Sequence, residues 1–261
     1  MRANVGTKKI LNNDINLIIK HEWIEDMLNS KETIKILDIC GGGGIWGIAL
    51  AKKLIEYNKA VDVIIVDIQK EALENAKKFG KEELGIDIIT SLQDVRKLSM
   101  PNYAPVDIVL FMGFSTPHFT PWELVKIFAG VSSVLSEDGI FIFDERNLNH
   151  WIMCHSGFKE ILIESINNEW PIFSIHADYN PIHGYYRRLV FDIQSGEVAP
   201  MSFYYWDIAC SSAFAWIFFD DVDIILKNSF EGYVLAYKPS KNIPSSKYLT
   251  SNPKCLRSEK K

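Results

Sequence analysis

An aspartate and a run of glycines stand together where a ligand could reach bare backbone. The segment ILDICGGGGIWGIAL, residues 36–50, passes from an apolar run through Asp38 into four glycines, Gly41–Gly44, and then into a second apolar run. Glycine has no side chain, so a ligand can approach the main chain closely there. A carboxylate beside such a turn favours a ligand that carries positive charge. The stretch therefore predicts a ligand-binding turn between a strand and a helix.

Two ligand classes compete for this turn. Gly42, Gly44 and Gly47 satisfy the spacing G-x-G-x-x-G of dinucleotide sites, a match that is weak when it stands alone. A dinucleotide brings a pyrophosphate with about two negative charges, which Asp38 would repel. S-adenosylmethionine (SAM) carries an ammonium, a sulfonium and only one carboxylate. The charge of Asp38 therefore favours SAM over a dinucleotide.

The same motif resembles that of the class I SAM-dependent methyltransferases, in which a strand ends in D-x-G-x-G-x-G. Asp38, Gly42 and Gly44 match this pattern, and Cys40 stands where the family usually has its first glycine. The resemblance covers roughly residues 30–145. It implies SAM as the cofactor and methyl transfer as the activity.

Two further landmarks of the family follow in order. An acid that ends the second strand matches Asp67 and would accept hydrogen bonds from the ribose hydroxyls, although dinucleotide sites have an acid there too. An acid after the third strand matches Asp94 and would pair with the adenine amino group. Taken singly, the three aspartates could instead be a helix N-cap, a turn residue and an Asx-turn. The resemblance implies these cofactor-binding residues: Asp38, Cys40, Gly42, Gly44, Asp67, Ile68, Asp94, Val95, Met112 and Gly113.

The methyl acceptor is expected above the end of the fourth strand. The segment FMGFSTPHFTPWE, residues 111–123, should line its pocket, with Phe114 and Trp122 as walls or as packing residues. His118 is the candidate base, with a capping or surface role as the alternative. Transfer from a sulfonium depends mainly on alignment, and a base is needed only for a protonated acceptor. The chain lacks both an N-P-P-Y-like segment and a Pro-Cys dipeptide, which argues against nucleobase chemistry.

The fifth strand ends in FIFDERNLNHWI, which is similar to an Asp-x-Arg-Asn segment of glycine N-methyltransferase-like enzymes. Asp144, Arg146 and Asn147 occupy its positions. The resemblance implies that Arg146 and Asn147 hold a carboxylate of a small substrate by charge-assisted hydrogen bonds. The alternative is a structural salt bridge between Arg146 and a neighbouring acid.

Residues 175–208 have period-2 strands around the turn QSGE, which predicts antiparallel strands in an inserted lid. Arg187 and Arg188 are adjacent on a strand, so only one of them can face the pocket. The aromatic run Tyr204–Trp206 could stack on a flat or cationic substrate, or form core under the lid.

The elements around these motifs alternate as in a parallel α/β sheet. We predict a doubly wound, mostly parallel seven-stranded sheet of Rossmann-like methyltransferase type, with an antiparallel lid inserted after strand five. Strands are expected at 33–39, 60–68, 86–90, 106–113, 139–145 and 229–238, and helices at 14–29, 45–57, 69–85, 121–135 and 219–228. The predicted regions are an N-terminal helical segment (1–30), the SAM-binding core (31–145), the lid (146–206), a C-terminal helix and last core strand (207–238), and a basic tail (239–261).

Composition narrows the partners. The 261 residues are 48% hydrophobic and carry a net charge of −5, which predicts a sizeable core and makes a nucleic-acid partner unlikely. The four cysteines are widely spaced and suggest neither disulfides nor a metal site. No apolar run approaches the roughly 18 to 20 residues of a membrane span. We expect a cytoplasmic protein and leave its oligomeric state open.

The sequence thus predicts a SAM-dependent methyltransferase acting on a nitrogen or oxygen atom of a small molecule. Three alternatives stay open. One is an RNA or protein methyltransferase that uses the basic tail. From residue 238 onward the chain has seven Lys or Arg residues and one acidic residue. The others are a non-catalytic SAM-binding module and an NAD-linked oxidoreductase.

Overall fold

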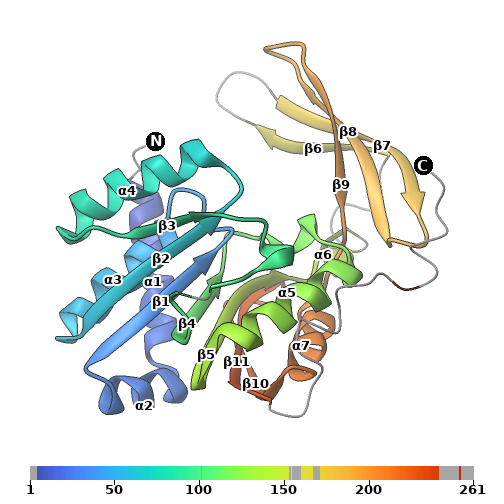
Figure 1. The fold of residues 1–261 in the computed structure, drawn as a ribbon. Coiled ribbons are helices and arrows are strands. Elements are labelled where there is room, and N and C mark those ends of the chain that lie inside the picture. The colour runs from blue at the N-terminus through green and yellow to red at the C-terminus, as the bar shows by residue number, and fades with distance from the viewer. Residues whose placement is uncertain are drawn as a thin grey trace.

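A seven-stranded sheet forms the centre of the molecule (Figure 1). The computed structural model describes residues 5–100, 102–152, 154, 160–166, 171–240 and 253. The strands of the central sheet are β1 (Thr33–Ile39), β2 (Ala60–Asp67), β3 (Ile89–Leu92), β4 (Val106–Phe111), β5 (Leu135–Arg146), β10 (Phe219–Leu226) and β11 (Glu231–Pro239). Their order is β10-β11-β5-β4-β1-β2-β3. The predicted seven-stranded, mostly parallel sheet is confirmed.

The strand order fixes where a ligand can bind. Strands β1 to β5 pair in parallel, whereas β11 runs antiparallel between β5 and β10. The chain order reverses between β1 and β4, and open α/β sheets bind ligands at the carboxyl ends of the strands beside such a switch. The glycine turn after β1 therefore lies at the expected edge.

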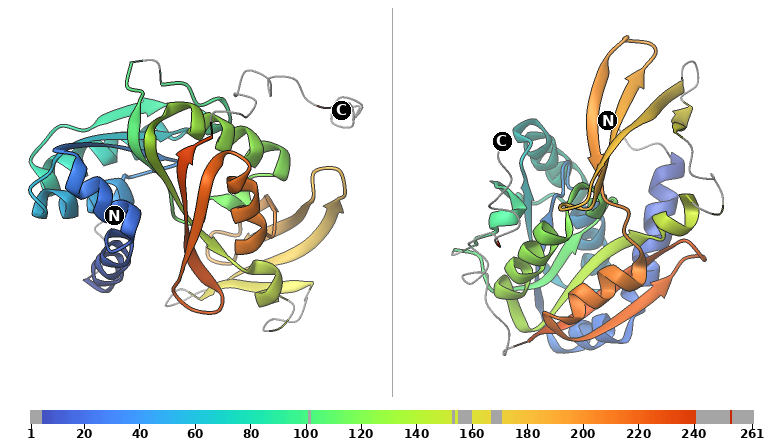
Figure 2. Two further views of the ribbon diagram at one scale, coloured as in Figure 1. Left: turned by 90° about the horizontal axis from the view of Figure 1, so that it is seen from below. Right: turned by 90° about the vertical axis from the view of Figure 1, so that its right-hand side faces the viewer.

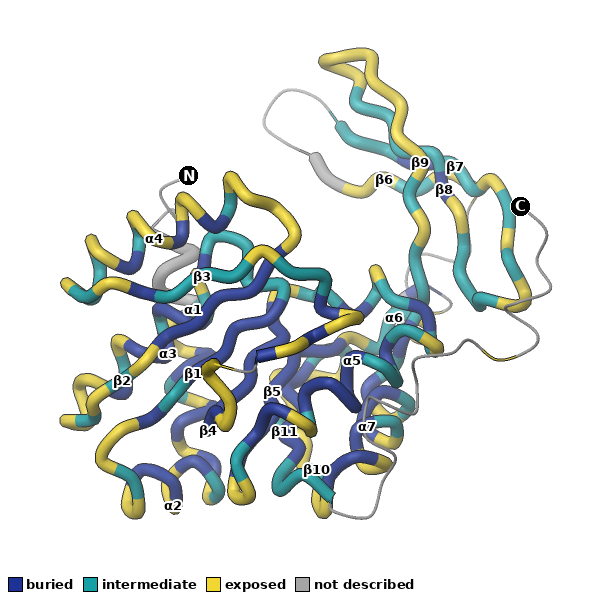
Figure 3. Tube along the Cα trace, viewed as in Figure 1, coloured by how far each residue is buried: buried dark blue, intermediate teal, exposed yellow. Residues whose placement is uncertain are grey.

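Helices cover both faces of this sheet (Figure 2). On one face lie α1 (Val5–Ile19), α2 (Glu22–Ser30), α3 (Ile45–Glu56) and α4 (Lys70–Leu84), and on the other α5 (Pro121–Val134) and α7 (Ile208–Trp216). Period-2 alternation divides β1 between the two cores: Ile34 and Ile36 pack toward the first group, Leu37 and Ile39 toward the second. The buried tube in Figure 3 follows the central strands.

Two expectations about single elements were wrong. The helix expected over 14–29 is two helices, because α1 ends at Ile19 and His21 is the N-cap of α2, where its ring nitrogen accepts a hydrogen bond from the Trp23 N–H. The helix expected over 219–228 is the edge strand β10, which pairs antiparallel with β11. The helix of this region precedes it as α7, whose N-cap Asp207 accepts from the Cys210 N–H.

The region after β5 forms a second, antiparallel sheet. It contains β6 (Ile161–Ile166), β7 (Pro171–Asn180), β8 (Tyr185–Asp192) and β9 (Val198–Phe203), joined in that order. The predicted turn at QSGE connects β8 and β9, and α6 (Leu148–Trp151) leads into the region. This lid sheet stands beside the carboxyl edge of the central sheet in Figure 1.

The basic tail lies outside the described residues except for Pro239, Ser240 and Pro253. Within the described chain, no helix is both long and apolar enough to cross a membrane.

Candidate active site

Asp38 ties the end of β1 to the start of α3. It follows Ile34 and Ile36 on the α3 face of the strand, and its Oδ2 accepts a hydrogen bond of 2.9 Å from the Gly47 N–H. A Cβ at Gly41 would lie 2.7 Å from the Asp38 carboxyl carbon, and one at Gly47 would lie 3.0 Å from its Oδ2. Asp38 thus caps α3 from nine residues away, and two of the glycines make room for it.

Asp38 is buried, with 1% of the residue exposed. Burial is the main cause that raises its pKa, to about 7; the hydrogen bond from Gly47 opposes this, and the charges of Asp67 and Asp144 add to it. The mouth of the turn is therefore rich in negative charge. Such a site favours a cation over a phosphate.

The glycine turn needs left-handed backbone at three positions. Cys40 has a φ of 52°, Gly42 of 50° and Gly44 of 75°. A Cβ at Gly44 would lie 2.3 Å from the Ile65 Cδ1 atom, whereas one at Gly43 would meet nothing within 4 Å. The left-handed φ at Cys40 explains why glycine is usual at this position of the family motif.

Asp67 holds the other side of the same turn. Its Oδ2 accepts from the Gly42 N–H and its Oδ1 from the Gln69 N–H, both at 2.8 Å. The turn role that the sequence left open is therefore present in the structure. The adjacent Ile68 is 69% exposed, so its side chain is available to a ligand. Asp67 brings the ends of β1 and β2 together.

Asp94 has a strong partner of its own. Both carboxylate oxygens accept from the Arg96 guanidinium at 2.7–3.0 Å, and Oδ1 also accepts from the Arg96 N–H. These bonds are the main cause that lowers the pKa of Asp94. Val95 is buried beside it, and Arg96 continues to Glu123 at 2.8 Å. The Asx-turn reading of Asp94 is realised, and its role toward adenine stays a prediction.

The end of β4 continues into the segment expected to line the acceptor pocket. Met112 is buried, while Gly113 and Phe114 have φ values of 87° and 54°. Their N–H groups donate to the carboxylate of Asp144 at 3.1–3.2 Å. Burial raises the pKa of Asp144 to about 6 against these hydrogen bonds. Asp144 therefore joins the end of β5 to the end of β4.

Arg146 covers the ring of Phe114. Its guanidinium carbon lies 3.3 Å from the ring centroid, and its Nε lies 3.3 Å from the Glu231 carboxylate. The salt bridge that the sequence offered as an alternative is thus present, together with a cation–π contact. The Arg146 side chain is 47% exposed, so contact with a ligand stays open to it.

The side-chain amide of Asn147 bonds to the protein backbone. Its Oδ1 accepts from the Ile208 N–H at 2.9 Å, and its Nδ2 donates to the Ser229 carbonyl at 3.3 Å. These bonds connect the end of β5 to α7 and to the turn before β11. Substrate binding by Asn147 stays a prediction that competes with this structural role.

His118 and Trp122 lie on the side that faces the lid. His118 is exposed at the end of the short 3-10 helix η2 (Thr116–His118), with its ring centroid 6.2 Å from that of Phe203 in β9. The indole N–H of Trp122 donates to the Ile182 carbonyl in the β7–β8 turn at 3.0 Å. Both residues therefore lie near the lid, and their roles toward an acceptor stay predictions.

Sequence reasoning did not single out Glu145. Its side chain is fully buried, and its Oε1 accepts from the Thr116 hydroxyl at 3.1 Å and from the Arg146 N–H at 2.9 Å. Desolvation raises its pKa to about 8. Two consecutive acids at the end of the apolar run FIF were the available signal, since neighbouring strand residues point to opposite faces and both faces of this sheet are covered.

The two lid arginines divide as strand alternation required. Arg188 is buried, with its Nε on the Ser174 hydroxyl at 2.6 Å, whereas Arg187 pairs with Asp178 on the exposed side. In the aromatic run, Trp206 is fully buried in the core, as the second reading proposed.

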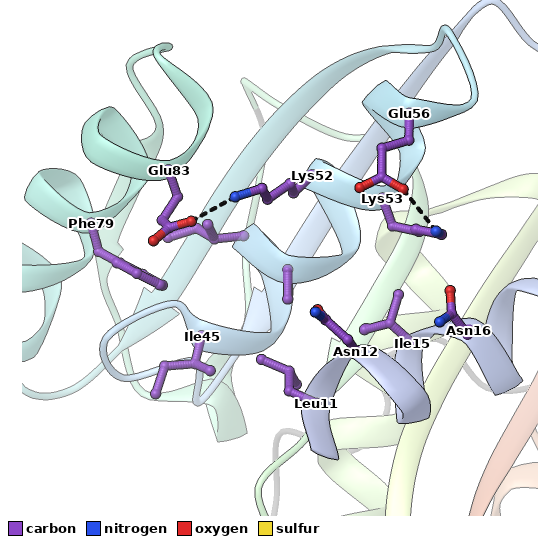
Figure 4. A pocket seen from close by; sticks show the side chains of 12 residues that line it. Leu11, Asn12, Ile15, Asn16, Ile45, Lys52, Lys53, Glu56, Phe79 and Glu83 are labelled. Carbon is purple, nitrogen blue, oxygen red and sulfur yellow. Dashed lines mark hydrogen bonds and ion pairs between the residues drawn. The ribbon is translucent and has the colours of Figure 1, made fainter. Parts of the chain in front are cut away.

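A cavity of about 220 Å³ lies away from this edge, between α1, α3 and α4 (Figure 4). Apolar side chains such as Leu11, Ile15 and Phe79 line it together with the pairs Lys52–Glu83 and Lys53–Glu56. None of the strand-end aspartates lines it. Among the described residues, no group of three or more His, Cys, Asp or Glu side chains is placed to hold a metal ion.

The sequence was compared with models of known protein families. Residues 36–139 match the model of a family described as a methyltransferase domain. These residues form a methyltransferase domain. The match begins in β1 and ends in β5, so it contains the glycine turn and the landmarks Asp38, Asp67 and Asp94. The assignment to the class I methyltransferases made from the sequence is confirmed.

Solved structures share the fold across almost the whole chain. The PH0226 protein from Pyrococcus horikoshii OT3 has a TM-score of 0.64 at 19% identity, covering 91% of this chain and 93% of its own. A SAM-dependent methyltransferase from Clostridium acetobutylicum ATCC 824 has a TM-score of 0.62 at 18% identity, with coverages of 92% and 94%. Magnesium protoporphyrin IX methyltransferase from Synechocystis PCC 6803, solved with bound SAH, has a TM-score of 0.52 at 13% identity, with coverages of 91% and 89%. Among curated proteins, none matches this sequence.

Proposed function

We propose that this methyltransferase transfers a methyl group from SAM to a nitrogen or oxygen atom of a small molecule. The observation that carries the proposal is the meeting of Asp38, Asp67 and the glycine turn at the ends of β1 and β2. Gly42 and Gly43 leave open backbone there, and the surrounding carboxylates favour a cation. When bound, SAM supplies the activated methyl group.

The residues of the turn have distinct roles in this proposal. Asp67 would accept the ribose hydroxyls, since a carboxylate has about four lone pairs and the backbone occupies two of them here. Ile68 and Val95 would flank the adenine, and Asp94 would accept its amino group. Met112 and Gly113 would border the donor on the β4 side, and Asp38 and Cys40 with Gly42 and Gly44 would shape the turn.

The acceptor would lie between the end of β4 and the lid. Phe114 and Trp122 would form its walls, and Arg146 and Asn147 would hold an anionic group on it. His118 would take up a proton if the acceptor arrives protonated. Support comes from position: His118 and Trp122 both contact or approach the lid, and Arg146 lies on Phe114.

Calorimetry with SAM and with S-adenosylhomocysteine (SAH) tests the cofactor part of the proposal. We expect Asp38→Ala and Asp67→Ala to lose at least about tenfold in affinity, because each removes a hydrogen bond to a charged group in the turn. Asp87→Ala, on an exposed carboxylate, is the control and should bind like the wild type. Unchanged affinity in both site variants would count against the proposed site. Turnover across a panel of small metabolites, followed as SAH formation, then identifies the acceptor.

The basic tail offers the alternative of an RNA or protein substrate. To test an RNA substrate against a small molecule, RNA affinity is measured at several salt concentrations for the full-length chain and for a variant that lacks residues 240–261. A contact with phosphates loses affinity steeply as salt rises. A flat response of the full-length chain removes the RNA alternative.

A further inference from the structure

The loop that follows β4 is held by the end of β5. We propose that Asp144 is a positioning residue of the transfer reaction, which fixes the Gly113–Phe114 turn so that donor and acceptor meet at one defined place. This inference rests on the proposed function. In that proposal Gly113 borders the donor and Phe114 borders the acceptor, so the turn lies between the two reactants.

The geometry of the contact is specific. The Asp144 carboxylate accepts from the Gly113 N–H at 3.2 Å and from the Phe114 N–H at 3.1 Å. Two successive N–H groups that point to one carboxylate define a single backbone conformation. Neutral acceptors in the same place would form weaker bonds than the ionised carboxylate does.

The turn needs such a partner. Gly113 and Phe114 are both left-handed, with φ values of 87° and 54°. Phenylalanine is disfavoured in this region because its Cβ approaches the following carbonyl oxygen. Bonds from outside the loop must therefore offset the strain, and those to Asp144 are made by the strained residue itself.

Three consecutive residues of β5 hold the same loop. Asp144 binds its backbone, Glu145 accepts from the Thr116 hydroxyl at 3.1 Å, and Arg146 lies over the Phe114 ring at 3.3 Å. Neighbouring strand residues point to opposite faces, so the loop is fixed from both sides. The arrangement depends on Asp144 most directly, because Asp144 accepts the backbone hydrogen bonds of both left-handed residues.

Asp144 has to be ionised to accept both N–H groups fully. Burial raises its pKa to about 6 against the hydrogen bonds from Phe114 and Gly113 and the charge of Arg146. The other titratable groups near it are Asp38 of β1, Tyr233 of β11 and the adjacent Glu145. Asp38 titrates in a similar pH range, so a pH profile of the wild type alone would not separate the two groups. The test therefore compares the wild type with the variants at each pH.

Asp144→Asn is the test variant and Asp107→Asn its matched control. Asp107 stands at the opposite end of β4, where it accepts from the Lys35 N–H at 2.9 Å and pairs with Lys31. Both changes remove the charge from a carboxylate that accepts a backbone N–H. Only Asp144 is at the carboxyl edge of the sheet.

Two readouts on the full chain decide. We expect amide hydrogen exchange in the peptide 112–118 to be about tenfold faster in Asp144→Asn, and SAH affinity at pH 7.5 to fall about tenfold or more. Asp107→Asn should change neither. The ratio of wild-type to Asp144→Asn affinity should approach one at pH 5, where the wild-type carboxyl group is also neutral.

Each other result overturns part of the inference. Unchanged exchange in the loop means that Asp144 does not hold it, and faster exchange with unchanged SAH affinity means that holding it does not matter for the site. No SAH binding by the wild type overturns the proposed function and this role with it, whereas the exchange result stands by itself. If Asp144→Asn does not fold, the wild type decides: its exchange in 112–118, corrected for intrinsic rates, should rise about tenfold below pH 6, and a flat profile refutes the contact.

Discussion

At the scale of single residues, Asp38 couples ligand charge to protonation. Its pKa of about 7 results from burial, opposed by the Gly47 hydrogen bond and increased by two nearby carboxylates. A cation bound in the turn favours the ionised form, so binding should release protons near neutral pH. SAM affinity should therefore rise with pH between 6 and 8, by up to about tenfold per pH unit.

Calorimetry of SAM binding at pH 7 in buffers with different ionisation enthalpies measures the released protons. The observed heat should depend on the buffer for the wild type and much less for Asp38→Asn. Equal heats in all buffers for the wild type would contradict the coupling.

The glycines of the turn differ in what they tolerate. Gly44 is left-handed and its Cβ would lie 2.3 Å from Ile65, so Gly44→Ala should lower the free energy of unfolding by about 1–2 kcal/mol. Gly43 has open space around the Cβ position, and Gly43→Ala should unfold like the wild type. Chemical denaturation of the two variants checks this. Equal losses would mean that the turn relaxes around Gly44.

At the scale of elements, α5 connects the core to the lid. Its first turn is closed by a capping box of Thr120 and Glu123, which fixes Trp122 between them. The Trp122 indole then reaches the β7–β8 turn at Ile182. The orientation of the β7–β8 hairpin of the lid therefore depends on the first turn of α5.

Trp122→Phe removes this hydrogen bond and keeps most of the ring area. We expect faster amide exchange in residues 180–186, by a factor that corresponds to about 1 kcal/mol, with little change in global stability. Trp216→Phe, on an exposed ring, is the control and should leave the hairpin unchanged. Unaltered exchange in Trp122→Phe would show that the hairpin is held by other contacts.

The two misassigned elements have different causes. Phe219, Val222 and Ile225 recur at near-helical spacing, yet the same residues suit an edge strand because two of them are β-branched. Pairing with β11 decides between the two periods. In the N-terminal region the amphipathic pattern continues through His21, and only its cap contact shows that the chain turns there.

At the scale of the whole molecule, three buried carboxyl groups make stability depend on pH. Burial raises the pKa of Asp144 to about 6, of Asp38 to about 7 and of Glu145 to about 8. The native state therefore binds more protons than the unfolded state between pH of about 4 and 8. Stability should fall as pH rises through this window, by at most about 1.4 kcal/mol per pH unit for each group.

Glu145→Gln isolates one of these groups. Its side chain carries no charge at any pH, so the variant should unfold like the wild type at pH 4, where Glu145 is largely neutral in both states, and be more stable by about 1 kcal/mol or more at pH 8. Thermal and denaturant unfolding at both values measure the difference. A wild type that gains stability from pH 6 to 8 would contradict the sign.

The sequence by itself determined the core of this protein. Alternating β-branched runs and helices, the strand-end acids Asp38 and Asp67, and glycines at left-handed positions are local features, so the sheet and the turn could be predicted from them. The methyltransferase class followed from the resemblance of this motif to that of a known family.

Only the tertiary structure decided how the side chains are used. Asp94 and Asn147 bond to Arg96 and to distant backbone, and Asp144 and Glu145 hold a loop some thirty residues earlier in the chain. Such contacts depend on which strands become neighbours, and β5 meets β4 only after a helix has crossed the sheet. A sequence pattern does not show which strands become neighbours, so these contacts could not be predicted from it.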